Sequence, residues 1–202
     1  MDMCKKWIAL GLVTALLSAA GLCVRVAAEQ RALAGRLIRL HVVAASDDPA
    51  DQARKLRVRD ALLPRITALT ADCPDAQSAA LRLGAALPEL AETAARTLGT
   101  GERVTARLAR ESFPRRDYER FSLPAGPYRA LRIVLGAGEG RNWWCVAFPA
   151  LCLPAAEPEA AFSEAAMAAG LSDGEIEYMS ADAPNVQLKF RLLDWLAELF
   201  RP

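Results

Sequence analysis

The chain has little histidine, few aromatic residues and few cysteines for its length. One histidine occurs in 202 residues and no Cys-x-x-Cys spacing is present, so the usual ligand sets of a zinc site cannot be assembled. Basic residues number 25 against 24 acidic ones, without a block of like charge. Proteins that bind nucleic acid need clustered lysine and arginine, so that class is excluded. We expect no metal, no cofactor and no nucleic-acid partner.

The first 28 residues are interpreted as an export segment that is separate from the folded part. Lys5 and Lys6 precede an uncharged apolar run over residues 7–24, and Val26-Ala27-Ala28 offers the small residues that signal peptidase needs. The run also approaches the roughly 20 residues that a membrane-spanning helix needs. Segment 1–28 is therefore a cleaved signal peptide or an uncleaved anchor, and the chain would contact a membrane only through an uncleaved leader.

Four later segments alternate apolar and polar residues in the manner of β-strands. They are residues 36–46, 102–111, 128–136 and 142–149. In the last segment, alternation places Trp143 and Cys145 on one side, and Trp144, Val146 and Phe148 on the other. The sequence GAGEGRN between the last two strands is expected to form a hairpin connection. A phosphate-binding loop would have to open a helix, and here a strand follows.

Helical spacing fills the stretch between the first two strands and the region after the fourth. The expected start and stop signals are Asp48-Pro49, Pro64, Asp72-Cys73-Pro74, Gly84, Leu87-Pro88, Gly99-Thr100-Gly101, Pro158, Ser172 with Glu175, and Pro184-Asn185. Pro64 should kink or end the first helix. Ser172 and Glu175 have the spacing of a capping box. The element order βααβββ followed by helices predicts a single α+β domain over 36–202, with helices on one face of a four-stranded sheet.

His41 and Cys145 are the candidate base and nucleophile of an enzyme. An exported thiol-dependent hydrolase that uses this pair is the alternative function. His41 is also explained as a partly buried polar residue on the second face of a strand. The bulky apolar neighbours of Cys145 would make its thiol unreactive. Asp47, Asp48 and Asp51 suggest calcium, but its ligands normally come from a longer loop that contains glycine, and helix capping accounts for all three.

Cys145 and Cys152 are the candidate pair for a disulfide. With Cys73 they are the three cysteines after the export segment, and an odd count in an exported protein suggests one bridge and one free thiol. Six residues separate the pair, and a turn at Pro149 would bring their Cα atoms within the roughly 7 Å that a bridge requires. In the other interpretation all three cysteines stay reduced and pack as small apolar residues.

The segment GRNWWCVAFPALC, residues 140–152, holds two of the four tryptophans. A strand that is apolar on both faces is covered on both faces, either by its own helices or by a partner. Packing in the core is the default explanation. Contact with a partner is the more specific explanation, because tryptophans anchor interfaces well.

Two stretches of the chain resemble stage II sporulation protein R of endospore-forming bacteria. They are IRLHVVAASDDPADQARKLRVRDALL (38–63) and FPRRDYERFSLPAGPYRALRIVLGAGEGRNWWCVAFPALC (113–152), and LPELAETAARTL (87–98) is a weaker third match. The elements NWWC, FP and LC follow one another in the order that is specific to that family. The resemblance spans essentially the whole exported domain.

The resemblance implies an intercompartmental signal and not an enzyme. Members are made in the forespore and exported into the space between the two sporulation membranes. There they activate a membrane-embedded aspartic protease of the mother cell, which cleaves pro-sigma-E. The candidate surface for this partner comprises Tyr118, Asn142, Trp143, Trp144 and Phe148.

Overall fold

The structure is a computed structural model that describes residues 2–99, 101–118, 121–152 and 159–180. In chain order the elements are α1 (Asp2–Arg36), β1 (Ile38–Val43), α2 (Pro49–Thr70), α3 (Ala76–Ala85), α4 (Leu87–Leu98), β2 (Val104–Phe113), β3 (Arg116–Asp117), β4 (Ser122–Leu123), β5 (Gly126–Leu135), β6 (Asn142–Phe148), α5 (Glu159–Ala168) and α6 (Asp173–Met179). The helix expected after Pro184 lies outside the described residues.

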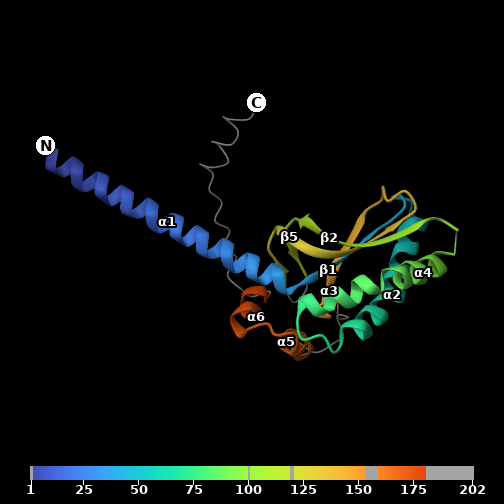
Figure 1. Ribbon diagram of the computed structural model, residues 1–202. Coiled ribbons are helices and arrows are strands. Elements are labelled where there is room, and N and C mark those ends of the chain that lie inside the picture. The colour runs from blue at the N-terminus through green and yellow to red at the C-terminus, as the bar shows by residue number, and fades with distance from the viewer. Residues whose placement is uncertain (1, 100, 119–120, 153–158, 181–202) are drawn as a thin grey trace.

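The main sheet has four strands in the order β2–β5–β1–β6. β5 is parallel to β1, while β6 is antiparallel to β1 and β2 is antiparallel to β5. α2, α3 and α4 pack on one face of this sheet (Figure 1). The predicted α+β fold, a four-stranded sheet with helices packed against it, is therefore confirmed.

The core of the domain lies between the sheet and α2. Three side chains of β1 and three of α2 are fully buried there: Ile38, Leu40, Val42, Val58, Leu62 and Ile66. Burying one such side chain contributes about 1.5–3 kcal/mol. The alternation of β1 and the helical spacing of α2 thus produce one continuous apolar layer, which holds the sheet against α2.

Several predicted helix ends are confirmed. Asp48 caps α2, and its carboxylate accepts a hydrogen bond from the backbone N–H of Ala50 at 2.8 Å. Ser172 and Glu175 form the capping box of α6. Gly99 follows α4 in the left-handed conformation, with φ of 69°, which glycine adopts without a steric penalty. These ends were predictable because each depends on residues within one turn of the chain.

Pro64 does not end α2, which continues to Thr70. A proline inside a helix removes one backbone hydrogen bond. Leu62 and Ile66, both fully buried, hold the turns on either side of Pro64 against the sheet. The tertiary packing therefore keeps the helix continuous past a residue that would end an isolated helix.

The glycine-rich connection between β5 and β6 is not a hairpin, which corrects the prediction from the sequence. β1 lies between these two strands, so segment 136–141 crosses the end of β1. The backbone N–H of Gly140 donates a hydrogen bond to the carbonyl of Ala44 at 3.0 Å. A Cβ atom on Gly140 would lie 2.1 Å from the carbonyl oxygen of Ser46. Glycine is needed here for a close approach of two backbones.

A register shift moves Phe148 to the opposite face from the one predicted. The pairing of β6 with β1 shifts between Ile38 and Arg39, so that Val146 lies opposite Arg39 and Phe148 lies opposite Ile38. Residues paired across strands share a face, and such a bulge switches the alternation. Phe148 therefore joins Ile38 on the helix-covered face and is 3% exposed, instead of lying beside Trp144.

α1 projects from the domain, and its last turn packs against it. Leu33 and Ala34 are 1% and 7% exposed, and Arg36 forms an ion pair with Glu175 of α6 at 3.0 Å. The packed part of the chain thus begins slightly before Arg36, the start expected from the sequence. Val13–Arg36 has the length and composition of a membrane-spanning helix, with a mean hydropathy of 1.2. This apolar helix is consistent with a signal peptide or a membrane anchor.

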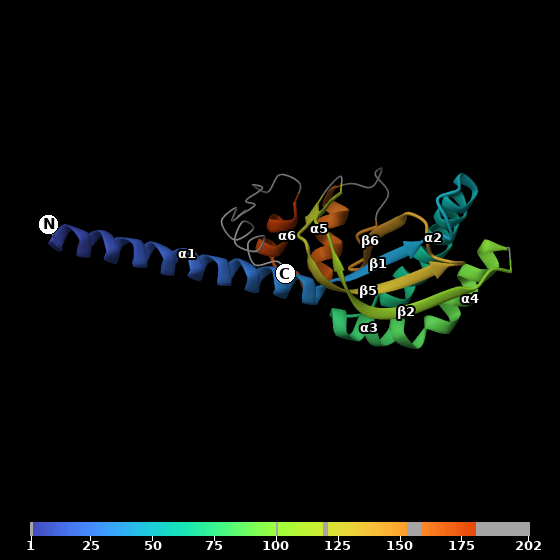
Figure 2. The ribbon, with the colours of Figure 1, turned by 90° about the horizontal axis from the view of Figure 1, so that it is seen from above.

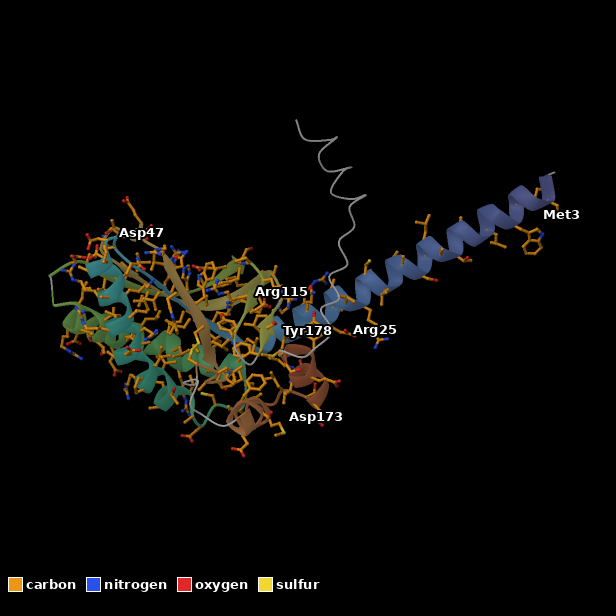
Figure 3. The ribbon with its side chains drawn as sticks, turned by 180° about the vertical axis from the view of Figure 1, so that it is seen from behind. Met3, Arg25, Asp47, Arg115, Asp173 and Tyr178 are labelled. Carbon is orange, nitrogen blue, oxygen red and sulfur yellow. A yellow bond between two sulfur atoms is a disulfide. The ribbon has the colours of Figure 1, made fainter. Side chains whose placement is uncertain are left out.

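The domain has two distinct ends along the strand direction. Figure 3 shows Arg115 and Tyr178 at the end where α1 joins, and Asp47 at the end farthest from α1. β1 starts at the near end, and the crossing segment 136–141 lies at the far end. The end of the sheet where α1 joins is therefore the near end, and the end that carries Asp47 and segment 136–141 is the far end.

Candidate functional site

The face of the sheet opposite α2, α3 and α4 carries a row of polar and aromatic side chains. We call this the open face, and Figure 2 looks onto it. Strand register places Arg107 opposite Arg132, Arg132 opposite His41, and His41 opposite Trp144. Adjacent strands lie about 4.8 Å apart, so these four residues span about 14 Å across the sheet. We call them the cross-strand row.

One carboxylate, that of Glu111, joins three members of the row. Its Oε2 accepts a hydrogen bond from His41 Nδ1 at 2.8 Å. Its Oε1 accepts from Arg107 Nη2 at 3.1 Å and from Arg132 Nη1 at 3.4 Å. Glu111 reaches the row over Ala109, whose small side chain leaves space between them. A single acidic residue therefore organises most of the row.

Opposing effects act on the pKa of Glu111. Burial alone would raise this pKa, but the hydrogen bond from His41 and the charges of His41 and Arg132 outweigh burial and lower it. The carboxylate is therefore ionised at neutral pH. It holds its three partners through charge-assisted hydrogen bonds, which are stronger than neutral ones.

His41 is a buried connection within this network. It is 6% exposed, and its Nε2 lies 2.8 Å from Asn142 Oδ1. With Glu111 on Nδ1, both ring nitrogens are occupied. The rings of Phe113 and Trp144 meet the imidazole edge-on, with centroids 5.8 and 5.9 Å away. His41 has no free nitrogen with which to accept a proton from a nucleophile.

The structure contradicts the proposed catalytic pair of His41 and Cys145. Cys145 lies opposite Leu40 in the register and therefore faces the helices, whereas His41 lies on the open face. Cys145 is also bonded to Cys152. A nucleophile and its base must lie within hydrogen-bonding reach of one another, and the sheet separates these two side chains.

Arg39 is a second charged residue on the open face, and it is completely buried. Its Nη2 donates a hydrogen bond to the hydroxyl of Tyr118 at 2.7 Å. Its Cζ lies 4.1 Å from the ring centroid of Phe113 and 5.2 Å from that of Tyr128. Nε and Nη1 have no hydrogen-bond partner among the described residues. Among the described residues, aromatic rings and not a carboxylate surround this guanidinium.

Burial changes the titration of the two tyrosines beside Arg39. It raises the pKa of Tyr128 to about 12, although the nearby charge of Arg39 acts in the opposite direction. It also raises the pKa of Tyr118 against the charge of Arg39 and the hydrogen bond from it. Both phenols are therefore protonated at neutral pH, and the Tyr128 hydroxyl donates to the Pro124 carbonyl at 2.7 Å.

Residues 113–118 and 121–125, which we call the arm, fold over Arg39. They contain the short antiparallel ladder of β3 and β4. Tyr118 stacks on Phe121 with centroids 4.5 Å apart, and Phe121 stacks on Phe162 of α5 at 5.3 Å. A continuous stack of side chains therefore connects Arg39 on the sheet to α5.

The five residues predicted as a partner surface do not form one surface. Asn142 and Trp144 lie on the open face, while Trp143 faces the helices and is half-buried. Tyr118 is half-buried in the arm, and Phe148 is buried in the core. A single partner can reach Asn142 and Trp144 together, but it cannot reach Phe148 in this conformation.

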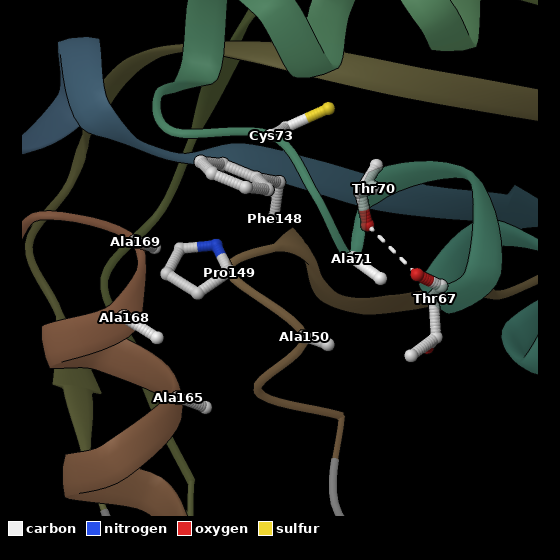
Figure 4. A pocket seen from close by; sticks show the side chains of 10 residues that line it. All are labelled: Thr67, Thr70, Ala71, Cys73, Phe148, Pro149, Ala150, Ala165, Ala168 and Ala169. Atoms are coloured by element: carbon white, nitrogen blue, oxygen red, sulfur yellow. Dashed lines mark hydrogen bonds between the residues drawn. The ribbon is translucent and has the colours of Figure 1, made fainter.

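A small pocket lies beside Phe148 and Pro149. Its volume is about 160 Å³, and Figure 4 shows α5 on one side and the end of α2 on the other. Most of its lining is alanine, proline and phenylalanine. The hydroxyl of Thr70 donates to the backbone carbonyls of Ile66 and Thr67, so its proton is used within α2. The pocket offers few polar groups to orient a ligand.

Asp47, Asp48 and Asp51 have separate partners within the protein. Asp48 caps α2, and Asp51 accepts a hydrogen bond from the Ser46 hydroxyl at 2.6 Å. Asp47 accepts from the backbone N–H of Arg141 at 2.7 Å. Because the three carboxylates have different partners, the structure gives no support to a calcium site here. Across the described ranges, no group of three His, Cys, Asp or Glu residues could hold a metal ion.

A disulfide joins Cys145 to Cys152, with Cα atoms 5.9 Å apart. This distance lies within the roughly 7 Å that a disulfide requires. The bridge ties the chain that follows β6 back onto that strand. Cys73 is a free, buried thiol in the segment between α2 and α3.

We predict that the bridge forms once the protein is outside the cytoplasm. Replacing both Cys145 and Cys152 by alanine should lower the free energy of unfolding by about 2–3 kcal/mol, because a short closed loop is released in the unfolded chain. Urea denaturation measures this loss. A Cys73→Ala variant is the control, since it leaves the bridge intact. Two alkylatable thiols at positions 145 and 152 in the exported protein, seen by non-reducing mass spectrometry, would contradict the prediction.

Comparisons with known proteins give one family. The family model described as stage II sporulation protein R matches residues 34–157. A protein named stage II sporulation protein R from Bacillus subtilis (strain 168) is 33% identical over 181 residues, which are 81% of this chain and 81% of that protein. No solved structure matches. The matched range begins in the last turn of α1 and includes the whole cross-strand row and the arm.

Proposed function

The chain belongs to the stage II sporulation protein R family and so has a role in sporulation, and we propose that it acts as an intercompartmental signal. It is made in the forespore and exported into the space between the two sporulation membranes. There it activates a membrane-embedded aspartic protease of the mother cell. The activated protease cleaves pro-sigma-E and so starts transcription in the mother cell.

The family match over residues 34–157 is the observation that carries this proposal. The exposed apolar helix α1 supports it, because an exported signal needs a leader or an anchor. The occupied ring of His41 supports activation by binding rather than by chemistry, since the one histidine of the chain has no free nitrogen. The protein is a ligand of a protease and does not itself turn over a substrate.

Time-resolved cleavage of pro-sigma-E in sporulating cells tests the proposal. Cells that lack the gene should leave pro-sigma-E uncleaved, and the full-length chain supplied in the forespore should restore cleavage. Normal cleavage in the deletion strain would contradict the proposal. So would cleavage of pro-sigma-E by the purified protein in the absence of the aspartic protease.

A Cys145→Ala variant separates the signal from the alternative hydrolase. A signal should lose stability but still trigger cleavage at a temperature where the variant is folded. A thiol-dependent hydrolase should lose all activity at every temperature, because its nucleophile is gone. Cys73→Ala serves as the matched control, since it removes a buried thiol that belongs to no predicted catalytic pair.

A further inference from the structure

We propose that the cross-strand row is the docking surface for an extended acidic segment of the aspartic protease that this protein activates. This inference rests on the proposed function and deepens it by naming the surface and the chemistry of its partner. The row comprises Arg107, Arg132, His41 and Trp144, and Arg116 of the arm lies beside it, with its Cζ 5.7 Å from the Trp144 ring centroid.

Among the described residues, the row and the adjacent Arg116 contribute three arginines, and Glu111 is the carboxylate that pairs with two of them. Arg107 and Arg132 share a single oxygen of Glu111, so each guanidinium uses one of its five N–H donors there. The second oxygen of Glu111 is taken by His41. The side chain of Arg107 is 60% exposed, so most of its donors face solvent. The whole chain carries a net charge of +1, so the excess belongs to this face and not to the protein in general.

The groups that a partner can reach on the open face are mainly hydrogen-bond donors. The side chain of Arg107 is 60% exposed and that of Arg132 is 27% exposed. The unpaired Nε1 of Trp144 and the unpaired Nε and Nη1 of Arg39 are buried in this conformation, so they do not contribute to an interface. Carboxylates supply acceptors and negative charge together, and they match guanidinium groups in pairs of hydrogen bonds. The chemistry of this surface therefore selects an acidic partner.

The dimensions of the row suit an extended peptide. An extended chain advances about 3.3 Å per residue, so about five residues cross the roughly 14 Å of the row. Side chains at alternate positions of such a segment point to the same side. Two acidic residues at alternate positions would meet Arg107 and Arg132, and the residue two positions further would reach Trp144. Trp144 is a firm anchor, because His41 and Phe113 hold its ring edge-on.

The direction of α1 favours a protein segment over a lipid surface. α1 leaves the domain at the end where β1 starts; it runs roughly in line with the strands in Figure 2 and rises obliquely toward the open-face side in Figure 1. A bilayer crossed by α1 would meet that end of the sheet first, and the far part of the open face would stay clear of the lipid. The face is therefore presented to neighbouring proteins in the same intermembrane space.

Removing two charges from the row tests the proposal. The Arg107→Thr, Arg132→Gln double variant of the full-length chain should bind the detergent-solubilised protease about tenfold more weakly than the wild type. It should also slow cleavage of pro-sigma-E in sporulating cells. The matched control, Arg57→Gln with Arg96→Gln, removes two exposed charges from α2 and α4 on the helix-covered side and should behave as wild type. Wild-type binding should weaken with added sodium chloride, as expected for an ionic interface.

A second variant guards against misfolding of the first. Arg116→Gln leaves the Glu111 network intact and should weaken binding several-fold without changing the melting temperature. Binding of both variants at the strength of the control pair would overturn the docking surface and leave the proposed function standing. Loss of binding to phosphatidylglycerol vesicles, with protease binding unchanged, would overturn it in favour of a membrane contact. If the wild type neither binds the protease nor triggers cleavage, the proposed function itself fails.

Discussion

Replacing Gly140 by alanine is expected to destabilise the domain by at least about 2 kcal/mol, or to prevent it from folding. The new Cβ would lie 2.1 Å from the carbonyl oxygen of Ser46 and 2.5 Å from its carbonyl carbon. These are backbone atoms, so they cannot rotate away as a side chain would. Relief requires the crossing segment to move, which breaks the hydrogen bond from Gly140 to the Ala44 carbonyl. Urea denaturation followed by circular dichroism measures the loss.

Gly84→Ala is the matched control for this substitution. A Cβ at Gly84 would meet no atom within 4 Å, and the residue lies inside α3. The control should gain about 0.4–1 kcal/mol, because alanine loses less backbone entropy in a helix. Equal unfolding curves for the two variants would contradict the close crossing of segment 136–141 over the end of β1.

Replacing Arg39 by alanine is expected to cost about 3–5 kcal/mol of unfolding free energy. The side chain is completely buried between the rings of Phe113 and Tyr128, so truncation leaves a cavity at the centre of the open face. Arg39→Met should cost far less or be neutral, because methionine fills similar space and removes two N–H groups that have no partner. Urea denaturation of both variants beside the wild type measures the difference.

Tyr118→Phe isolates the hydrogen bond in this comparison. It removes the acceptor at 2.7 Å from Arg39 and keeps the ring that stacks on Phe121. We expect a loss of about 1.5–3 kcal/mol, typical of a hydrogen bond to a charged group. If Arg39→Met proved as destabilising as Arg39→Ala, the charge itself and not the filled volume would be the stabilising feature.

The helices and strands were largely predictable from the sequence, whereas the order in which the strands pair in the sheet was not. Alternation identified each long strand, and local signals such as Asp48 and Ser172 identified helix starts. The hairpin prediction failed because periodicity does not report which strands pair. β1 comes first in the chain and inserts between β5 and β6, and this pairing depends on contacts distant in sequence.

The candidate site was harder to predict than the fold. His41 was correctly interpreted as a partly buried polar residue, but Glu111 and Arg132 were not singled out, because each was only one residue within a predicted strand. Only the strand register brings them together, from positions 70 and 21 residues apart in the chain. Phe148 was misplaced for a related reason, because a single register shift reverses the face of a side chain. Cys145 and Cys152 could be named as a candidate pair because their separation depends on a short turn, while the sequence left open whether they are bridged or reduced.

Because α1 continues into the packed domain without a break, its length beyond the apolar run sets the distance between the bilayer and the domain. The apolar run ends near residue 24, and residues 25–32 continue as the same helix before its last turn packs on the domain, which amounts to about 12 Å at 1.5 Å per residue. In the uncleaved form this stem would lift the sheet above the bilayer by that distance and prevent it from bending toward the lipid. The domain could then only swivel about the helix axis, which carries the open face around a circle of fixed height. The height of this circle predicts where along a neighbouring membrane protein the contact is made.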